Sequence, residues 1–524
     1  MLKLLIQSIL ELFIKFFEFL ANKRTLEIHQ KEKSYALSHL NLSSASNEVE
    51  QLTGKHPGQS GFSLLENNLD AFLARSHLIN NAEKTLDLQY YYFQGDTSGR
   101  LISELLINAA DRGVRIRLLL DDIDTLGADE PISILNVHHN IEIRIFNPFK
   151  FRSLLRYIEF ITDLSRVSRR MHNKAMIMDN CQAIIGGRNI GDIYFAADPE
   201  LLFLDVDLLA VGPIVSQISN SFDEYWNSQW AVPVSALYPE PDKHYALNRI
   251  KAYLNRHVQD VKQTDYVQAL QESELSRTKS ISELPLIWSD VELYYDSPEK
   301  LNGHNQQEIK QLKNSLREIV NSANTEITFI SPYFVPGENG LAWFRDIRHK
   351  GIKVNVITNS LAATDVVAVH AGYAEYRKEL LSTGVNIYEI KQSAYVREKS
   401  KFKMLRAGSR TSLHAKIVII DRQKVFIGSA NLDPRSSYLN TEMGLLVDNA
   451  TLACEVLDVF GEAAIKNHSY SLQLAKTTEI NKSDILWVDE EEGKQRIHYS
   501  DPEAGFRRRL MVKLLRLLPF EELL

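Results

Sequence analysis

The spacing of apolar residues divides the chain into two stretches that predict the same elements in the same order. In the first stretch, residues 85–93 and 114–120 have the composition of buried strands. Between them, residues 101–111 have helical spacing, and Gly113 marks the end of that helix. A strand, a helix and a second strand in succession are typical of a parallel sheet covered by helices.

A later stretch repeats this order. Residues 326–330 predict a strand, residues 341–350 a helix and residues 352–358 the next strand. The local sequences match as well, because residues 112–116 read Arg-Gly-Val-Arg-Ile and residues 350–354 read Lys-Gly-Ile-Lys-Val. We therefore predict an α/β fold in which whole lobes, and not only short motifs, are duplicated.

Each stretch is followed by the same polar motif. Both copies read His-x-Lys, four residues, Asp, six residues and Gly-Gly/Ser-x-Asn. The motif positions are His172, Lys174, Asp179 and Asn189 in the first copy, and His414, Lys416, Asp421 and Asn431 in the second. A single His-x-Lys is usually a solvated strand end, but two complete copies with equal internal spacing are hard to obtain by chance.

The strand period explains why the motif has this spacing. Residues 417–420 are an apolar, β-branched run, so they predict a buried strand. Alternate side chains of a strand share a face, which places His414 and Lys416 on one side at roughly 6–7 Å between Cα atoms. Asp421 is an odd number of residues from His414 and should point away, as should Asp179. We expect both aspartates to be structural, ion-paired or capping.

Each motif copy offers three groups with complementary chemistry. Lysine binds phosphate as a point charge, and asparagine supplies N–H donors. Histidine is the one member that exchanges protons near neutral pH. Two copies of this set predict a site that acts on a phosphate ester.

The paired motif resembles that of the phospholipase D superfamily. The resemblance implies two pseudo-symmetric α-β-α lobes, each with a mixed β-sheet flanked by helices, and one active site at the lobe interface. Shorter segments resemble the C-type cardiolipin synthases of bacteria over residues 58–524. These segments are 58–62 (Gly-Gln-Ser-Gly-Phe), 89–92 (Gln-Tyr-Tyr-Tyr), 147–149 (Asn-Pro-Phe), 170–174 (Arg-Met-His-Asn-Lys) and 517–521 (Leu-Leu-Pro-Phe-Glu).

This resemblance implies a phosphohistidine mechanism. His172 is assigned as the nucleophile and His414 as the acid and base, although the two roles are interchangeable. The lysines hold the non-bridging phosphate oxygens with Asn189, Asn431 and Ser429, while Gly187 replaces the serine in the first half. The predicted catalytic set is His172, Lys174, Asp179, His414, Lys416 and Asp421. No metal or cofactor is expected, since the two lysines already supply positive charge.

Each histidine also needs a hydrogen-bond acceptor for its second ring nitrogen. Glu442 lies on the strand predicted after the second motif, and Asp205 occupies the aligned place in the first half. We predict that these two carboxylates orient the histidines, with Asp207 as the alternative to Asp205.

The predicted domain organisation follows these patterns. It consists of an amphipathic membrane-associating helix (1–24), a linker (25–60), an N-terminal lobe (61–235), a connector (236–300), a C-terminal lobe (301–468) and a tail with a basic amphipathic helix (469–524). The net charge of −7 argues against a general nucleic-acid binder. Two cysteines provide no disulfide framework.

Three segments suggest contact with a membrane. In residues 1–20 the polar side chains occupy one narrow helical face, which favours a helix lying in the bilayer interface. A helix packed on protein, or a degenerate spanning anchor, also fits. Residues 506–518 combine arginine and leucine, as suits an anionic surface, although a solvated face with a core side is equally consistent. The apolar run at 151–161 either dips into lipid or belongs to the core.

The leading functional hypothesis is a cardiolipin synthase at the bacterial cell membrane, bound peripherally or by its N-terminus. It would move a phosphatidyl group from phosphatidylglycerol or phosphatidylethanolamine to phosphatidylglycerol, with no nucleic acid and no obligate protein partner. A phospholipase D would use water as the acceptor instead. A nuclease of the same superfamily, or an inactive membrane-binding scaffold, are weaker alternatives.

Overall fold

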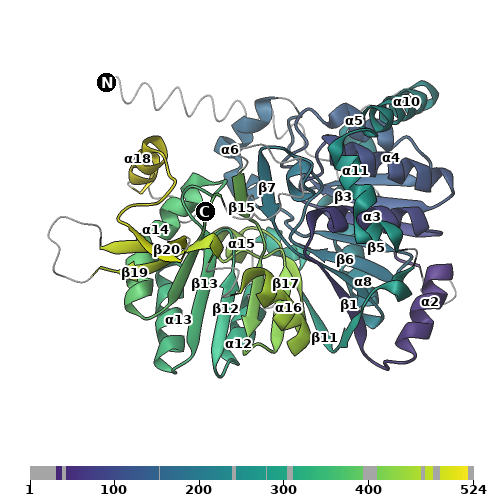
Figure 1. The fold of residues 1–524 in the computed structure, drawn as a ribbon. Helices are drawn as coiled ribbons and strands as arrows, with labels where there is room; N and C mark the ends of the chain where they lie inside the picture. Colours follow the sequence, from purple (N-terminus) through teal and green to yellow (C-terminus); the bar gives the residue numbers. More distant parts are fainter. Residues whose placement is uncertain are drawn as a thin grey trace, which may run out of the picture.

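The computed structural model describes the greater part of the chain. The described residues are 31–37, 43–152, 154–238, 243–278, 280–303, 311–393, 410–461, 467–475, 484–491 and 493–516. The amphipathic helix predicted at 1–24 and the segment 517–521 therefore lie outside the described residues. Figure 1 shows two lobes side by side, each built on one large sheet.

The sheet of the first lobe is mixed, as predicted. Its central strands β2 (Thr85–Tyr90), β3 (Arg115–Asp121) and β4 (Ile141–Phe146) are parallel. In the described part of the chain this sheet has nine strands in the order β10-β1-β8-β6-β5-β2-β3-β4-β9. The remaining strands are β1 (Ser60–Leu65), β5 (Ala175–Met178), β6 (Gln182–Gly186), β8 (Asp207–Val211), β9 (Ala231–Pro233) and β10 (Ile287–Ser289).

The second lobe repeats this arrangement. Strands β12 (Glu326–Ile330), β13 (Lys353–Asn359) and β14 (Asn386–Ile390) are its parallel centre. Over the described residues the sheet has ten strands in the order β11-β18-β17-β16-β12-β13-β14-β19-β20-β21. The others are β11 (Val291–Tyr295), β16 (Ile417–Ile420), β17 (Lys424–Gly428), β18 (Met443–Asp448), β19 (Ser469–Leu474), β20 (Ile485–Glu491) and β21 (Lys494–His498).

Helices cover both faces of each sheet. On the outer faces lie α3 (Asn68–Asn81) and α4 (Thr97–Asp111) in the first lobe, and α13 (Gly337–His349) and α14 (Val367–Ser382) in the second. Helix α4 starts where the Asp96 carboxylate accepts the Gly99 N–H. It stops before Gly113, which has a φ of +98° that a residue with a Cβ rarely adopts.

One hydrophobic core joins the lobes. It combines residues of both sheets with the helices α8 (Pro213–Asn227) and α16 (Ala450–Phe460). A two-stranded parallel sheet also crosses the interface, in which β15 (Arg410–Leu413) pairs with β7 (Leu201–Leu204). Because apolar packing and backbone hydrogen bonds both cross this boundary, the two halves of any site placed there are held in fixed relation.

Two of the predicted boundaries differ from the observed elements. The connector predicted at 236–300 ends in β10 and β11, which are edge strands of the first and second sheets. Strands β19, β20 and β21 extend the second sheet into the tail predicted at 469–524. The reason is that β21 is exposed along most of its length, so its sequence carries little hydrophobic alternation.

The linker predicted at 25–60 is also more ordered than its composition indicates. It contains helix α2 (Ser44–Thr53), which begins with a capping box at Ser43. Residues 31–37 form an extended strap across the first lobe, where Arg117 and Asn227 donate to the Ser34 carbonyl oxygen. These hydrogen bonds come from residues more than eighty positions away, so no local sequence pattern predicts them.

Candidate active site

The two His-x-Lys motifs lie where the lobes meet. The backbone N–H of His172 donates to the carbonyl oxygen of Thr441 in the second lobe, at 2.9 Å. The N–H of His414 donates to the carbonyl oxygen of Leu204 in the first lobe, at 2.7 Å. Each histidine is therefore fixed in place by the lobe to which it does not belong.

The imidazole rings also form hydrogen bonds that cross from one lobe to the other. His172 Nδ1 lies 2.8 Å from Glu442 Oε2, and His414 Nδ1 lies 2.6 Å from Asp205 Oδ2. Since a carboxylate accepts, each Nδ1 carries the proton, and each Nε2 is left as the nitrogen with a lone pair. The structure thus brings both carboxylates predicted from the sequence to a histidine, each to the one in the opposite lobe.

Both motif lysines are buried beside their histidines. Lys174 Nζ donates to the His172 carbonyl oxygen at 2.6 Å, and Lys416 Nζ donates to that of His414. Burial lowers the pKa of Lys174 to about 7 and that of Lys416 to about 8. An anion bound between them would restore their charge, because an opposite charge favours the ammonium form.

The electrostatics of the two histidines show that the motif copies share one environment. Burial lowers the pKa of His172 well below its usual value, and the charges of Lys174 and Lys416 lower it further. Burial and Lys416 lower the pKa of His414 to about 4. These lowered pKa values favour the neutral ring, which is the form that attacks phosphorus.

The two carboxylates have different environments. Burial raises the pKa of Glu442 to about 7. Burial also acts on Asp205, but the hydrogen bond with His414 and the charges of Lys416 and Arg188 outweigh it and lower the pKa of this carboxyl group. The duplicated halves thus differ in charge although each histidine has the same kind of hydrogen bond to a carboxylate.

The predicted phosphate ligands are placed less uniformly. Asn189 is held by its neighbours, with Oδ1 accepting the Tyr92 N–H and Nδ2 donating to the Tyr194 hydroxyl. Asn431 is buried, and its Oδ1 lacks a hydrogen-bond partner among the described residues. Ser429 differs from expectation, because its hydroxyl donates to Glu442 and its backbone N–H to the Met443 carbonyl oxygen. Ser429 therefore positions a carboxylate and has no proton left for phosphate.

The motif aspartates point away from the histidines, as strand parity predicts. Asp179 accepts the backbone N–H groups of Glu83, Lys84 and Thr85. Asp421 accepts those of Asn324, Thr325 and Glu326 in the same way. These hydrogen bonds link the hairpin of each motif to the start of the neighbouring parallel strand. The role of both aspartates is therefore structural.

Comparison with known proteins identifies the family to which this arrangement belongs. A family model described as a cardiolipin synthase, PLD-like domain matches residues 76–226 and 316–463, more than half of the chain. The chain belongs to this cardiolipin synthase family with phospholipase D-like domains.

Individual relatives agree with this assignment. The chain is 42% identical to cardiolipin synthase C of Escherichia coli over 90% of its own length and 98% of that protein. It is 23% identical to the major cardiolipin synthase ClsA of Bacillus subtilis over 75% of its length and 67% of that protein. The crystal structure of phosphatidylserine synthase from Haemophilus influenzae has the same fold, with a TM-score of 0.56, 12% identity and coverage of 91% of this chain and all of that one.

Within this member of the family, a glycine accounts for the difference between the halves. A Cβ added at Gly187 would lie 2.3 Å from the Asp205 carboxylate, closer than any real contact. The second half has room for Ser429 because its carboxylate, Glu442, is one methylene longer and accepts the serine hydroxyl. The pairs Gly187 with Asp205 and Ser429 with Glu442 are therefore two alternative ways to hold a carboxylate against a histidine.

Gly187→Ser tests this packing. The added side chain should displace Asp205 from His414 and reduce turnover about 100-fold, because errors near 1 Å at a reacting group cost that much. Gly95→Ser is the control, since a Cβ there meets nothing within 4 Å. Turnover and melting temperature should be measured together. Unchanged turnover in a folded Gly187→Ser protein would contradict the assignment of Asp205.

Asn359 and Asp121, which were not predicted from the sequence, hold the backbone just before the two motif histidines. Asn359, the last residue of β13, accepts the Leu413 N–H at 2.8 Å and donates to the Leu413 carbonyl oxygen at 2.9 Å. Asp121, the last residue of β3, accepts the Met171 N–H at 2.8 Å. Leu413 and Met171 each precede a motif histidine. Both supporting residues stand eight positions after the matched glycines Gly113 and Gly351, a signal that the sequence repeat contained.

Other missed residues lie in the predicted connector and near Asp207. Asp296 exchanges two hydrogen bonds with the Glu442 backbone, and Lys300 neutralises its buried carboxylate at 2.9 Å. Asp207, the alternative histidine partner, binds the buried Arg75 and Arg188 instead. Within the described ranges, no group of three or more His, Cys, Asp and Glu side chains is placed to hold a metal ion.

Asn359→Asp should impair positioning of His414. The substitution replaces the amide donor with a carboxylate oxygen that faces the Leu413 carbonyl oxygen, so we expect kcat to fall about 10- to 100-fold while KM changes less than twofold. Asn355→Asp, on the same strand and hydrogen-bonded to Thr328, is the matched control. Equal losses in both variants would show that the effect is only a buried charge.

The lysine pKa values predict an alkaline limit. An ammonium group is needed to bind the phosphate anion, so kcat/KM should fall as pH rises above about 7, the pKa of Lys174. The kcat value should persist to higher pH, because bound phosphate raises that pKa. In Lys174→Arg the limit should move to about 8, where Lys416 titrates. A limit that stays at the same pH would contradict the role of Lys174.

Proposed function

We propose that the protein is a cardiolipin synthase that transfers a phosphatidyl group from one phospholipid to phosphatidylglycerol. The observation that carries this proposal is the pair of buried His-x-Lys motifs, each with its Nδ1 held by a carboxylate of the other lobe. Family membership and 42% identity to a cardiolipin synthase over nearly that protein's full length support the same reaction.

The reaction requires a nucleophile and a proton donor on opposite sides of one phosphorus atom. Nε2 of His172 attacks phosphorus, a P–N bond forms, and the P–O bond to the headgroup alcohol breaks. His414 gives its Nε2 proton to the departing oxygen. In the second half-reaction His414 removes the proton of the phosphatidylglycerol hydroxyl, whose oxygen displaces His172. The two histidines could also take the opposite roles, because each has its Nδ1 hydrogen-bonded to a carboxylate.

The remaining motif residues stabilise negative charge. Lys174 and Lys416 are buried at 1% and 2% exposure, so their attraction to non-bridging oxygens is little screened by water. Asn189 and Asn431 add amide donors at the same positions of the two halves. A bound phosphodiester anion would also raise the pKa of His414, which its role as proton donor requires.

The protein acts at the bacterial cell membrane in this proposal, held peripherally or through its N-terminal residues. Both substrates are phospholipids, and the donor is phosphatidylglycerol or phosphatidylethanolamine. Among the residues that the structure describes, none of the helices combines the length and apolarity needed to cross a bilayer. We expect no nucleic-acid substrate, because the net charge of the chain is −7, and no obligate protein partner.

A product assay tests the function. Purified protein with mixed vesicles of phosphatidylglycerol and phosphatidylethanolamine should form cardiolipin, as measured by mass spectrometry. His172→Ala and His414→Ala should each lower the rate by at least about 100-fold, since each removes a nucleophile or an acid. His139→Ala, at an exposed histidine outside the motifs, should retain the wild-type rate. Phosphatidic acid as the sole lipid product would indicate a hydrolase instead.

A further inference from the structure

Exposed apolar side chains are concentrated on two short segments. Among the described residues, eighteen large hydrophobic side chains are exposed, and eight of them fall within the 154–167 segment and helix α18 (Phe506–Leu515). These eight are Leu155, Tyr157, Ile161, Leu164, Phe506, Leu510, Met511 and Leu514. Such clustering in about two dozen residues is unlike the scattered single exposures of an ordinary protein surface.

The first segment turns its charges inward and its apolar side chains outward. It consists of η1 (Leu154–Ile158), α6 (Glu159–Thr162) and α7 (Leu164–Val167). Arg156 donates to carbonyl oxygens after β3, and Arg166 pairs with Glu159 and Asp163. These two arginines thus anchor the segment to the first lobe. Its outward face keeps Ile161 68% exposed.

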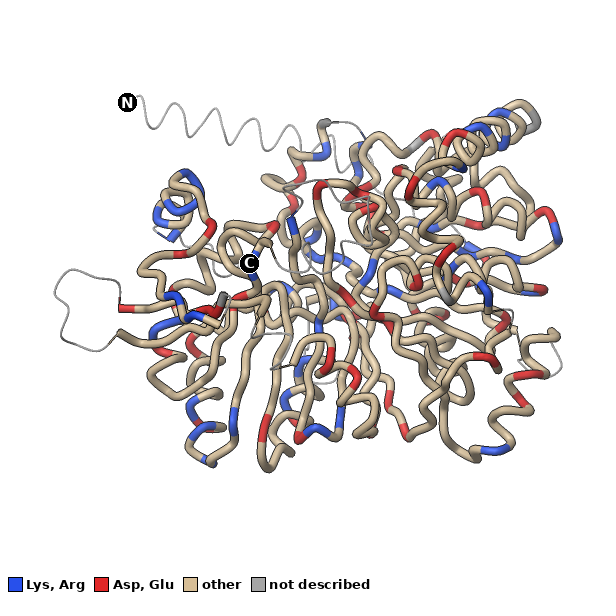
Figure 2. The backbone as a smooth tube through the Cα atoms, in the orientation of Figure 1, with Lys and Arg blue, Asp and Glu red and all other residues tan. Residues whose placement is uncertain are grey.

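Helix α18 has two distinct faces. Val512 is buried against α14, and Arg508 donates to the carbonyl oxygens of Ala362 and Thr364. The opposite face exposes Phe506, Leu510 and Leu514, spaced four residues apart. The helix contains four basic residues and no acidic one, and Figure 2 shows this positive charge along it. An apolar stripe flanked by cations matches the interface of an anionic bilayer.

Both segments lie at the edge that carries the histidines. The 154–167 segment follows the carboxyl end of β4, and α18 rests on the loop that follows the carboxyl end of β13, in which Val366 is also exposed. The backbone in front of the two motif histidines is held at the carboxyl ends of β13 and of β3, the parallel neighbour of β4. In Figure 1, α6 and α18 both project from the upper edge of the molecule.

We propose that the 154–167 segment, Val366 and α18 form one docking surface that inserts into the outer layer of an anionic phospholipid bilayer. The proposal rests on the proposed function and adds the orientation in which the enzyme meets its substrate. Both lobes contribute one apolar segment, so the interface between them, where the histidines meet, faces the lipid headgroups. A phosphodiester can then reach the site without leaving the membrane.

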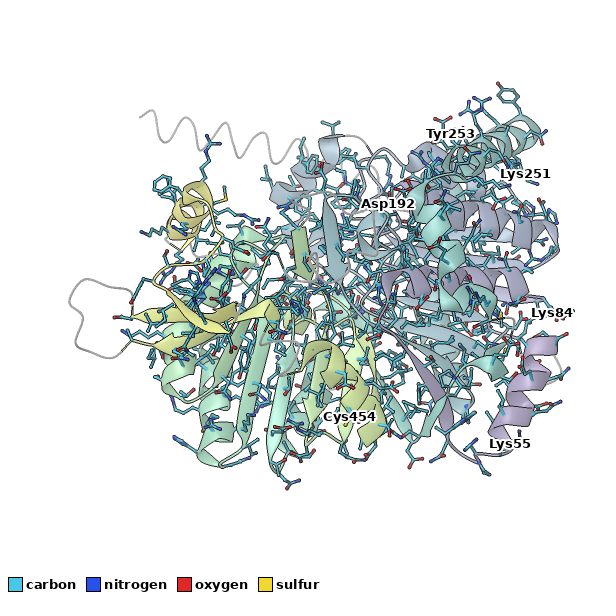
Figure 3. The ribbon with its side chains drawn as sticks, in the orientation of Figure 1. Lys55, Lys84, Asp192, Lys251, Tyr253 and Cys454 are labelled. Carbon is cyan, nitrogen blue, oxygen red and sulfur yellow. The ribbon has the colours of Figure 1, made fainter. Side chains whose placement is uncertain are left out.

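An insertion probe tests the surface directly. Leu510→Cys in a Cys454→Ser background is labelled with a polarity-sensitive dye, and the full-length chain is mixed with vesicles of phosphatidylglycerol and phosphatidylcholine. The emission should shift to the blue as it does for a dye in lipid. The control is the same dye on native Cys454, which is exposed on α16 at the lower edge in Figure 3 and should stay in water. Bound protein with an unshifted dye at position 510 would overturn the proposal.

Substitutions give a second, independent readout. Phe506→Ser/Leu510→Ser/Leu514→Ser and Tyr157→Ser/Ile161→Ser should each weaken vesicle binding at least tenfold. Each should leave turnover of detergent-dispersed lipid within twofold. Leu37→Ser, an exposed leucine beside the hairpin at the far end of β5, is the matched control. Unchanged vesicle binding in both variants would overturn the docking surface alone. Failure of the wild-type chain to make cardiolipin from dispersed lipid would instead overturn the proposed function.

Discussion

Two histidine–carboxylate hydrogen bonds that cross between the lobes are the interaction on which the site depends. Neither lobe contains a complete set, because His172 relies on Glu442 and His414 relies on Asp205. A buried ring whose Nδ1–H lacked an acceptor would lose its orientation and expose a polar group to an apolar surrounding. The shared core and the β7–β15 pair therefore serve a chemical purpose, since they hold each ring against its distant partner.

The two halves share the histidine–carboxylate hydrogen bond but differ in the residues and charges around it. The first half uses Asp205 with Gly187, and the second uses the longer Glu442 with Ser429. Arg188 adds positive charge near Asp205, whereas Glu442 is more strongly affected by burial and its pKa rises. One ring thus faces an ionised carboxylate and the other a carboxyl group that titrates near neutrality. This difference is a physical basis on which two equivalent histidines can take different parts in one reaction.

The direction of the parallel strands links the chemistry to the membrane. In both sheets the carboxyl ends of the central strands reach the same edge, so Asp121 and Asn359 support the histidines there. The segments that follow these strands are free to carry other functions, because they lie outside the sheet. Here they supply or support the exposed apolar segments. The site and the surface that we propose for lipid are consequently built at the same edge of the two sheets.

Local sequence patterns were enough to predict the lobes, the motif residues and the strand face on which each motif residue lies. Strand alternation placed His414 beside Lys416 and turned Asp421 away, and the matched glycines marked equivalent strands. The sequence also indicated Asp205 and Glu442, since each follows its motif at an aligned place. These features are local, so a periodicity of two residues or an equal spacing is enough to reveal them.

The pairing of each carboxylate with a histidine could be read only from the folded chain, because it depends on how the two lobes pack and not on any local pattern. For the same reason, the strap at 31–37, the two edge strands at the end of the connector and the hydroxyl of Ser429 were assigned otherwise from the sequence. Each is fixed by partners that lie far along the chain or on another strand. Long-range hydrogen bonds and packing contacts produce no periodic pattern in the sequence of the residues that make them.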